Sequence, residues 1–387
     1  MIQARHAAYY TQFMTERKQE IKTNLQLEAL RLIDLDFENV RMAWFYLVRG
    51  QQWEQLSRFL HSLWFYCDVR TRGQEALELL EHAEKGLRLA QPSAVVELVL
   101  GRVMAPLGWY YNDVGFCKKG ANMCDEAIHL LRQHGSPEDL ISALFDRQNV
   151  AFSLYQPDVA VKLAEEGLKI AQSIGDKYWE GHLLLWAGAG SQNGEQVIFG
   201  HTHQFAERAL VIFEELGDLW GMMRALNVLG QAYRNEQQFE MAKHCFRKAL
   251  SIAESFRHPL SVAREQNMLA RIAMIERDYS HAHKLWRQAL QQYWRAGYKW
   301  IAPYPLQNIA ELYAAQDNFG RAVMILGVIH SNLINRGQTD RKAQALQKEL
   351  EAQMEPERFA AAWGRGQERT LNSLVNDLLA EPEFTKS

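Results

Sequence analysis

The stretch LNVLGQAYRNEQQFEMAKHCFRKAL, residues 226–250, recurs twice further along the chain with the same order of small, large and polar residues. The second copy is QNMLARIAMIERDYSHAHKLWRQAL at 266–290, and the third is LQNIAELYAAQDNFGRAVMILGVIH at 306–330. An offset of about 40 residues is the length of two helices and two turns. The repetition therefore predicts stacked pairs of antiparallel helices in place of one closed core.

Each copy has the same internal pattern. Apolar residues three and four positions apart mark one face of the first helix, and a small residue, Gly230 or Ala270, marks a close crossing of the paired helix. The second helix is expected to follow a polar turn and an aromatic residue, and to carry a small residue of its own. These aromatic and small residues are Phe239, Tyr279 and Phe319, and Ala242, Ala282 and Ala322.

The template extends toward the amino terminus with less regularity. A regular copy contains Leu107, Gly108, Tyr111, Gly120, Cys124 and Ala127. The copy around Ala160 has Pro157 in its turn, the copy around Ala206 follows a longer loop after Gly190, and a weaker copy spans 73–83. The pattern predicts an all-α solenoid with about seven helix pairs over 51–330, an amino-terminal helical cap at 1–50 and a carboxy-terminal helical cap at 331–387.

Composition excludes several classes of function. The chain has 387 residues, with 43 Lys plus Arg against 46 Asp plus Glu, so no broad field favours nucleic acid or anionic lipid. Four cysteines without a CxxC pair predict buried thiols in a reducing compartment and no disulfide. Since no apolar run has the length of a signal peptide or a membrane span, we expect a cytoplasmic protein without membrane contact.

The sequence also contains no set of residues that predicts catalysis. There is no GxxxxGK[ST] phosphate loop, and the glycines at 188, 190 and 194 lack the spacing of a dinucleotide loop. His201 and His203, like His281 and His283, are two residues apart and would diverge on a helix, which argues against a metal site. We expect a non-catalytic protein without metal or cofactor.

The inner face of the first helices is the candidate binding surface. The 40-residue period predicts that Arg224 lies beside Arg264, Asn227 beside Asn267, and Gln231 beside Arg271. Neighbouring arginines repel unless an anionic or carbonyl-rich ligand lies between them, and asparagine can bond a peptide backbone. The alternative is a solvated polar face with the arginines paired to Glu265 or Glu311. The candidate residues are Arg224, Asn227, Gln231, Arg234, Asn235, Arg264, Asn267 and Arg271, with Arg102, Trp109, Asn112, Tyr304 and Gln307 as further members.

The repeat resembles the tetratricopeptide family, in a variety with a period near 40 residues. The end motifs, residues 5–13, residues 33–44 and EPERFAAAWGRG at 355–366, are similar to the ends of helical sensor regions in bacterial STAND-type signal-transduction NTPases and their transcription regulators. The resemblance implies a right-handed solenoid that binds a peptide, a protein segment or a small anionic ligand in its concave groove. It also implies an NTPase module as a partner in a longer protein. The alternatives are a structural oligomerisation scaffold and a stand-alone peptide-responsive regulator.

Overall fold

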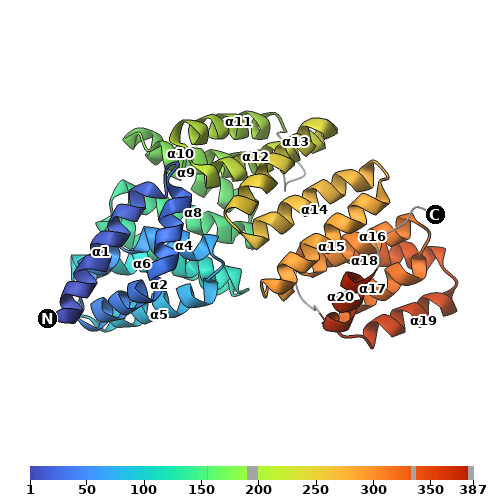
Figure 1. Cartoon of the computed structure of the whole chain (residues 1–387), viewed down its shortest axis with the longest axis horizontal. Helices are drawn as coiled ribbons and strands as arrows, with labels where there is room; N and C mark the ends of the chain where they lie inside the picture. The colour runs from blue at the N-terminus through green and yellow to red at the C-terminus, as the bar shows by residue number, and fades with distance from the viewer. Residues whose placement is uncertain (155, 190–198, 333–336, 382–387) are drawn as a thin grey trace. The chain divides into compact units, whose positions relative to one another are not determined.

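The computed structural model describes residues 1–154, 156–189, 199–332 and 337–381, and these ranges are helical throughout apart from short turns, with no strand (Figure 1). The prediction of an all-α chain built from repeated helix pairs is confirmed. The longer loop expected after Gly190 falls on residues 190–198, outside the described residues. Contacts divide the chain into two compact units, unit 1 (residues 1–236) and unit 2 (residues 237–387).

Unit 1 begins with a group of amino-terminal helices and continues into regular pairs, in which α6 packs on α7, α8 on α9 and α10 on α11. Its helices are α1 (Ile2–Glu20), α2 (Gln26–Arg49), α3 (Trp53–Ser57), α4 (Leu60–Val69), α5 (Gly73–Leu89), α6 (Ala94–Asp113), α7 (Cys117–His134), α8 (Pro137–Ser153), α9 (Pro157–Ile174), α10 (Lys177–Ala189), α11 (Phe199–Leu216) and α12 (Leu219–Asn235).

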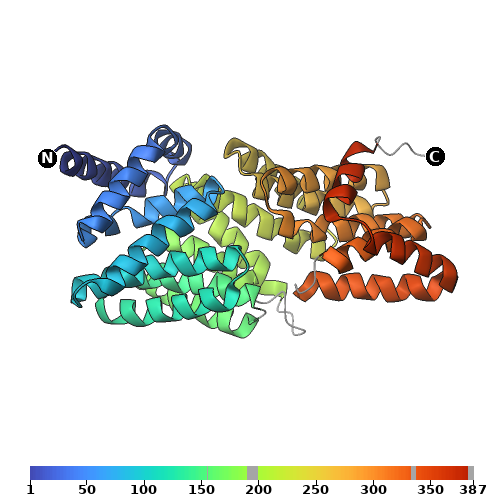
Figure 2. The same cartoon turned by 90° about the horizontal axis from the view of Figure 1, so that it is seen from below.

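Unit 2 holds the second helix of the first regular copy, the two regular copies that follow it, and the carboxy-terminal helices (Figure 2). Its elements are α13 (Phe239–Ser255), α14 (Pro259–Ile275), α15 (Tyr279–Arg295), the 3-10 helix η2 (Lys299–Ile301), α16 (Pro303–Ala315), α17 (Phe319–Asn332), α18 (Gly337–Gln353), α19 (Pro356–Gln367) and α20 (Leu371–Ala380). Phe239, Tyr279 and Phe319, expected just before the second helices, are their first residues. The small residues Ala242, Ala282 and Ala322 are fully buried, as the repeat pattern predicted.

Glycines allow two close helix crossings. At the crossing of α6 and α7, a Cβ at Gly108 would lie 2.5 Å from the Cys124 Sγ, and one at Gly120 would clash with the Gly108 carbonyl oxygen. In unit 2, a Cβ at Gly366 of α19 would clash with the Met324 carbonyl oxygen of α17, and one at Gly327 would lie 2.8 Å from the Trp363 carbonyl oxygen. Both crossings bring the two backbones closer than any side chain allows.

The turns repeat in backbone conformation as well as in position. Between helix pairs, Gly217, Arg257 and Gly297 have φ of 70°, 54° and 82°. Within pairs, Gln237, Arg277 and Asp317 have φ of 62°, 60° and 60°. Each series is spaced by the repeat period, and in the left-handed region a residue with a Cβ is strained by roughly 1–2 kcal/mol. The period is therefore built into the turns even where the side chains differ.

Substituting Arg257 with glycine should raise the free energy of unfolding by about 0.5–1 kcal/mol, because relief of left-handed strain exceeds the extra backbone entropy of glycine. Arg257 is exposed, so its side chain contributes little packing. The reciprocal change Gly297→Ala meets no atom within 4 Å and should lower the free energy of unfolding by about 1 kcal/mol. Urea unfolding followed by circular dichroism measures both. A destabilised Arg257→Gly protein would contradict the strain argument.

The amino-terminal helices contact the last helix of unit 1. The Gln26 Nε2 donates to the Asp218 Oδ1 at 2.5 Å, and the Trp220 backbone N–H donates to the Gln26 Oε1 at 3.1 Å. Asp218 also accepts the Gly221 N–H at 2.8 Å as the N-cap of α12. Gln26 and Asp218 are both fully buried. Gln26 and Asp218 are 192 positions apart in the chain, so this hydrogen bond joins the two ends of unit 1. In a solenoid whose repeats contact only their neighbours, such a long-range contact would be absent.

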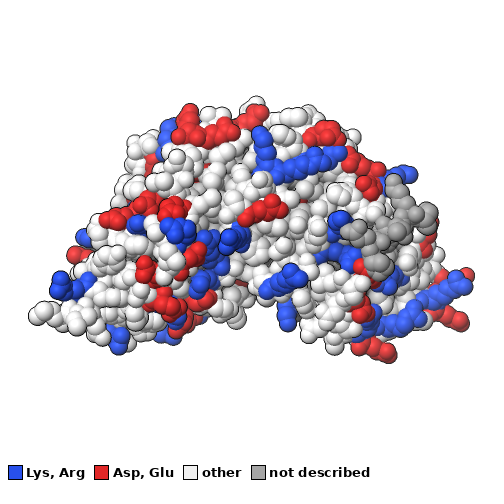
Figure 3. All heavy atoms as spheres, in the orientation of Figure 1, with Lys and Arg blue, Asp and Glu red and all other residues white. Residues whose placement is uncertain are grey.

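No helix in the described residues is long and apolar enough to cross a bilayer. On the face that Figure 3 shows, acidic and basic side chains are interspersed over the surface of both units. This mixing agrees with the net charge of −3 and leaves no broad patch of one sign on that face.

Candidate functional site

A cavity of about 310 Å³ lies inside unit 1, between the amino-terminal helices α1, α3 and α4 and the first helices α6, α8 and α10 of three successive pairs. We call it the unit 1 cavity. Its lining includes Lys18, His61, Trp64, Arg102, Asp146 and Trp179. Side chains from helices far apart in sequence therefore converge on one half-open cavity.

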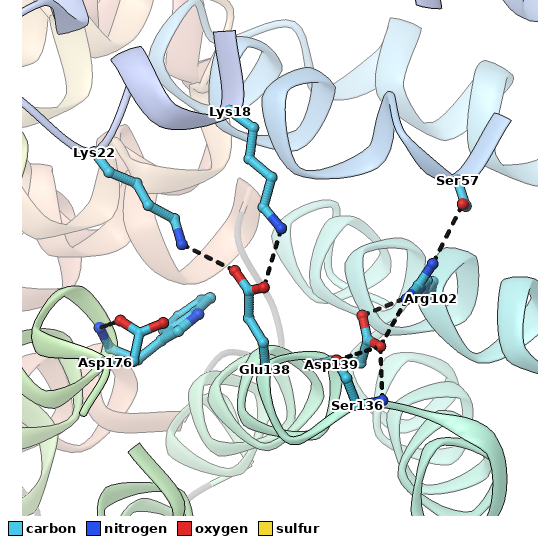
Figure 4. A network of polar contacts seen from close by, with 9 residues as sticks. Lys18, Lys22, Ser57, Arg102, Ser136, Glu138, Asp139 and Asp176 are labelled. Carbon is cyan, nitrogen blue, oxygen red and sulfur yellow. Dashed lines mark hydrogen bonds and ion pairs between the residues drawn. The ribbon is translucent and has the colours of Figure 1, made fainter. Parts of the chain in front are cut away.

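Two groups of ion pairs form one side of the unit 1 cavity (Figure 4). The Arg102 Nε and Nη2 donate to the two Asp139 carboxylate oxygens, each at 2.8 Å, and the Arg102 Nη1 donates to the Ser57 Oγ at 3.3 Å. Asp139 also accepts the Ser136 N–H at 2.9 Å in the capping box that begins α8. The same carboxylate thus orients Arg102 and fixes the start of a helix.

Glu138 joins α1 to α8. It accepts from the Lys22 Nζ at 2.9 Å and from the Lys18 Nζ at 3.1 Å. Burial alone would raise the pKa of Glu138, but the two ammonium groups outweigh it and lower this pKa to about 2. The carboxylate is therefore ionised across the ordinary pH range and holds the amino-terminal helix against the repeat.

Replacing Glu138 with glutamine should lower the free energy of unfolding by about 1 kcal/mol at pH 6, since two half-buried ammonium groups lose their partner. The folded-state pKa is depressed, so this contribution is present above pH 4.5 and lost as pH falls toward 2. Urea titrations at several pH values should show the difference between wild type and variant shrinking below pH 4.5. Glu28→Gln, at an exposed pair with Arg31, is the control and should change nothing measurable. A pH-independent difference would contradict the electrostatic origin.

Asp146 lies on the cavity wall without a partner. It is 3% exposed and makes no hydrogen bond or ion pair with any residue that the structure describes. Burial, and then the charge of Asp68, raise the pKa of Asp146 well above its ordinary value. The same two causes raise the pKa of Asp113 to about 7. The Asp68 carboxylate on α4 is therefore close enough to disfavour the charge of Asp113 on α6 and of Asp146 on α8.

An aromatic cluster adjoins these carboxyl groups. Trp109 stacks on Phe145 with ring centroids 6.2 Å apart, Trp64 meets Trp109 edge to face at 6.0 Å, and Trp179 lies 5.4 Å from Phe145. The indole N–H groups of Trp64, Trp109 and Trp179 are buried and donate to no acceptor among the described residues. Buried donors ordinarily have acceptors, so these three indoles have unused hydrogen-bonding capacity.

His61 adds a neutral ring to the lining. Its Nε2 is buried without a hydrogen-bond partner in the described part of the chain. Burial and the nearby Lys22 and Lys18 lower the pKa of His61 well below its ordinary value. The imidazole is therefore uncharged near neutral pH, and His61 can donate or accept a hydrogen bond.

The predicted binding residues of unit 1 fall into two groups. Trp109 belongs to the aromatic cluster, and the Arg224 guanidinium lies over the Phe145 ring at 5.3 Å and the Trp186 ring at 5.5 Å. The structure thus brings Arg224 to the cluster that contains Trp109, while Arg102 is engaged by Asp139. Four of the other predicted residues bond one another within α12. The Gln231 Nε2 donates to the Asn227 Oδ1 at 2.7 Å, and the Arg234 Nη2 donates to the Asn235 Oδ1 at 3.1 Å. The Asn112 Oδ1 is buried without a partner among the described residues.

The predicted residues of unit 2 are mostly engaged in contacts of their own. The Arg264 Nε donates to the buried Glu265 at 2.9 Å, which is the pairing that the alternative interpretation anticipated. The Asn267 Oδ1 accepts from the Trp286 Nε1 at 2.9 Å and from the Asn308 Nδ2 at 2.8 Å. The Gln307 Nε2 donates to the Glu311 Oε1 at 3.0 Å. The Tyr304 side chain is 47% exposed, and Arg271 is half-buried. The predicted neighbours Arg224 and Arg264, Asn227 and Asn267, and Gln231 and Arg271 belong to different units and stay predictions.

The sequence argument missed Lys18, His61, Trp64, Asp146 and Trp179, although one signal for Asp146 was present. In the repeat register, DRQN at 146–149 stands where other copies have PLGW at 106–109, VLGQ at 228–231 and MLAR at 268–271. Four consecutive polar residues therefore replace the apolar and small residues of a helix crossing, and all four are buried. Buried polar residues at a core register indicate a specialised interior.

Comparison with known proteins identifies the repeat and the fold. Residues 224–256 match the model of the tetratricopeptide repeat family. No curated protein matches the chain in sequence. Within the described residues, no group of three His, Cys, Asp or Glu side chains is arranged to hold a metal ion.

Three solved structures have the same helical architecture. A Rap protein complexed with Competence and Sporulation Factor is 12% identical, with a TM-score of 0.58 over 90% of this chain and 100% of that chain. A STAND protein with a tetratricopeptide repeat sensor from Pyrococcus horikoshii is 14% identical, with a TM-score of 0.57 over 93% of this chain and 54% of that chain. NprR in complex with its cognate peptide NprX is 14% identical, with a TM-score of 0.50 over 82% of this chain and 87% of that chain. At these identities the likeness shows the fold, an all-α array of tetratricopeptide-like repeats.

Proposed function

We propose that this chain is a binding module that takes a peptide or protein segment on the inner face of its first helices. One observation carries the proposal: α6, α8 and α10, the first helices of successive pairs, line a single cavity whose buried indole donors and carboxyl group have no partner among the described residues. A peptide backbone supplies a carbonyl acceptor and an N–H donor at nearly every residue, which is what such a wall lacks.

The similar structures support the same kind of ligand. NprR was solved with its cognate peptide, and the Rap protein with Competence and Sporulation Factor. On a shared fold, different proteins can use the same inner surface for different ligands. The proposal therefore names a peptide or protein segment and leaves its sequence to experiment.

A sensor role in a longer regulator is the finer part of the proposal. This chain spans about half the length of the STAND protein from Pyrococcus horikoshii, whose repeat region is described as a sensor. By analogy, ligand binding here would bias a switch in an attached bacterial NTPase or transcription-regulator module. The predicted unit 2 residues Arg264, Asn267, Arg271, Tyr304 and Gln307 are proposed as further contacts for the same class of ligand.

The test begins with a random peptide library selected against the immobilised chain, followed by fluorescence polarisation with the selected peptides. The double variant Arg224→Ala, Arg264→Ala should bind them at least about ten-fold more weakly, because it loses one cation in the aromatic cluster and one on α14. Arg31→Ala, which removes only an exposed pair with Glu28, is the matched control and should bind as wild type does. Melting curves establish that the variants fold. Unchanged affinity in the double variant would show that the inner-face assignment is wrong.

A further inference from the structure

Asp146 is the least compensated charge in the wall of the unit 1 cavity. Asp146 is only 3% exposed, it lines the cavity, and it has no hydrogen-bond or ion-pair partner among the described residues. A buried carboxylate without a partner is unfavourable, so the native ligand-free state favours the protonated acid. A ligand that brings a positive charge to this position would restore the ionised form and supply the missing partner.

We propose that the unit 1 cavity selects a ligand carrying an alkylammonium or guanidinium group and seats that group against Asp146. This inference rests on the proposed function only in placing the ligand on the inner face. It adds the chemical class of the group that enters the cavity, which the exposed surface of the chain does not indicate.

Four of the cations near the cavity bond groups other than Asp146. Lys18 and Lys22 bind Glu138, and Arg102 binds Asp139 with two hydrogen bonds. Arg147, which follows Asp146 in the chain, donates its Nε to the Asp125 carboxylate at 2.7 Å. Arg58 also belongs to the lining but is exposed. The cavity lining therefore has one carboxyl group, Asp146, with which no cation of the described residues forms an ion pair.

The surroundings of Asp146 suit an organic cation better than a metal ion. Trp64 and Trp179 line the same cavity, and indole faces attract ammonium and guanidinium groups. Asp68 adds negative potential from α4, since its charge contributes to the raised pKa of Asp146 after burial. No three-ligand group for a metal exists among the described residues. A volume of about 310 Å³ has room for a basic side chain or a short amine.

Titration calorimetry on the full chain tests the proposal with three probes. N-acetyl-arginine amide represents a basic peptide side chain, spermidine represents a free amine, and N-acetyl-citrulline amide is the neutral isostere of the first. At least one cationic probe should bind. If the cavity takes a basic side chain of a peptide, N-acetyl-citrulline amide should bind at least about ten-fold more weakly than N-acetyl-arginine amide. The tighter of the two cationic probes identifies the source of the charge.

The variant Asp146→Asn keeps the shape of the side chain and removes its charge. Because burial penalises the carboxylate, this variant should fold with at least the stability of wild type while binding the cationic probe at least about ten-fold more weakly. Asp158→Asn, on the exposed face of α9, is the matched control and should bind as wild type does. Absence of saturable binding by both cationic probes, or equal binding to wild type and Asp146→Asn, overturns the proposal.

The two proposals fail in distinguishable ways. Library peptides that bind through Arg224 and Arg264 with no preference for basic residues would leave the proposed function intact and overturn the role of Asp146. Conversely, binding of spermidine that depends on Asp146, with no selected peptide binding at all, would support the cation site and overturn the peptide function.

Discussion

Replacing Asp218 with alanine should lower the free energy of unfolding of unit 1 by about 4 kcal/mol, through loss of a helix cap and of a buried hydrogen bond. The fully buried carboxylate accepts from Gln26 and from the Gly221 N–H, and its Oδ2 lies 3.4 Å from the His182 Nε2. Alanine leaves the Gly221 N–H without its side-chain acceptor, and the Gln26 Nε2 keeps only the Ile21 carbonyl oxygen at 2.7 Å. Because Gln26 lies at the start of α2, the loss should also loosen the amino-terminal helices.

Urea unfolding followed by tryptophan fluorescence measures this effect. Asp278→Ala removes the N-cap of α15 at an exposed position, so it should cost only about 1 kcal/mol. A double-mutant cycle with Gln26→Ala should give a coupling energy above about 1 kcal/mol, since the two side chains share a buried hydrogen bond. Equal losses for Asp218→Ala and Asp278→Ala would show that the contact with Gln26 contributes nothing beyond the cap.

Replacing Gly366 with alanine should lower the free energy of unfolding of unit 2 by about 3 kcal/mol, because the new methyl group collides with the α17 backbone at the Met324 carbonyl. Backbone atoms cannot rotate away as side-chain ends can, so α19 must shift as a whole. The neighbouring Gly364 lies in the same helix, and a Cβ added there would meet no atom within 4 Å. Gly364→Ala should therefore be neutral or stabilising by up to about 1 kcal/mol through helix propensity.

This pair of variants separates packing from helix propensity, since each exchanges glycine for alanine in one helix of unit 2. Thermal unfolding followed by circular dichroism gives the sign of each change. Hydrogen exchange then locates the change, and in Gly366→Ala the amides of α19 should lose protection before those of α14 and α15. Similar melting temperatures for the two variants would contradict the close crossing of α17 and α19.

The repeat architecture could be predicted because it depends on local periodicity. The small residues at Ala242, Ala282 and Ala322 mark buried crossings directly, and the aromatic residues at 239, 279 and 319 were placed within one residue of their helix starts. Helix boundaries of this kind are set by residues close in sequence, so one chain contains the needed information.

The unit 1 cavity could not be predicted from the repeat because it depends on helices outside the regular pattern. Part of the lining of the unit 1 cavity comes from α1, α3 and α4, whose positions follow from long-range contacts such as Lys22 with Glu138 and not from any period. Arg102 and Arg264 were candidate ligand contacts, and Asp139 and Glu265 engage them in the structure. Such pairing depends on which carboxylates the packed helices bring near, which spacing on a single helix does not reveal.

The bond between Gln26 and Asp218 has a consequence for biosynthesis. At ribosomal speeds of about 5–20 residues per second, the segment that contains Asp218 is synthesised on the order of 10–40 s after Gln26. During that interval the Gln26 side chain lacks Asp218 and the Trp220 N–H, the partners that it has in the folded protein. Unit 1 should consequently reach its protease-resistant state only after the segment around Asp218 has left the exit tunnel.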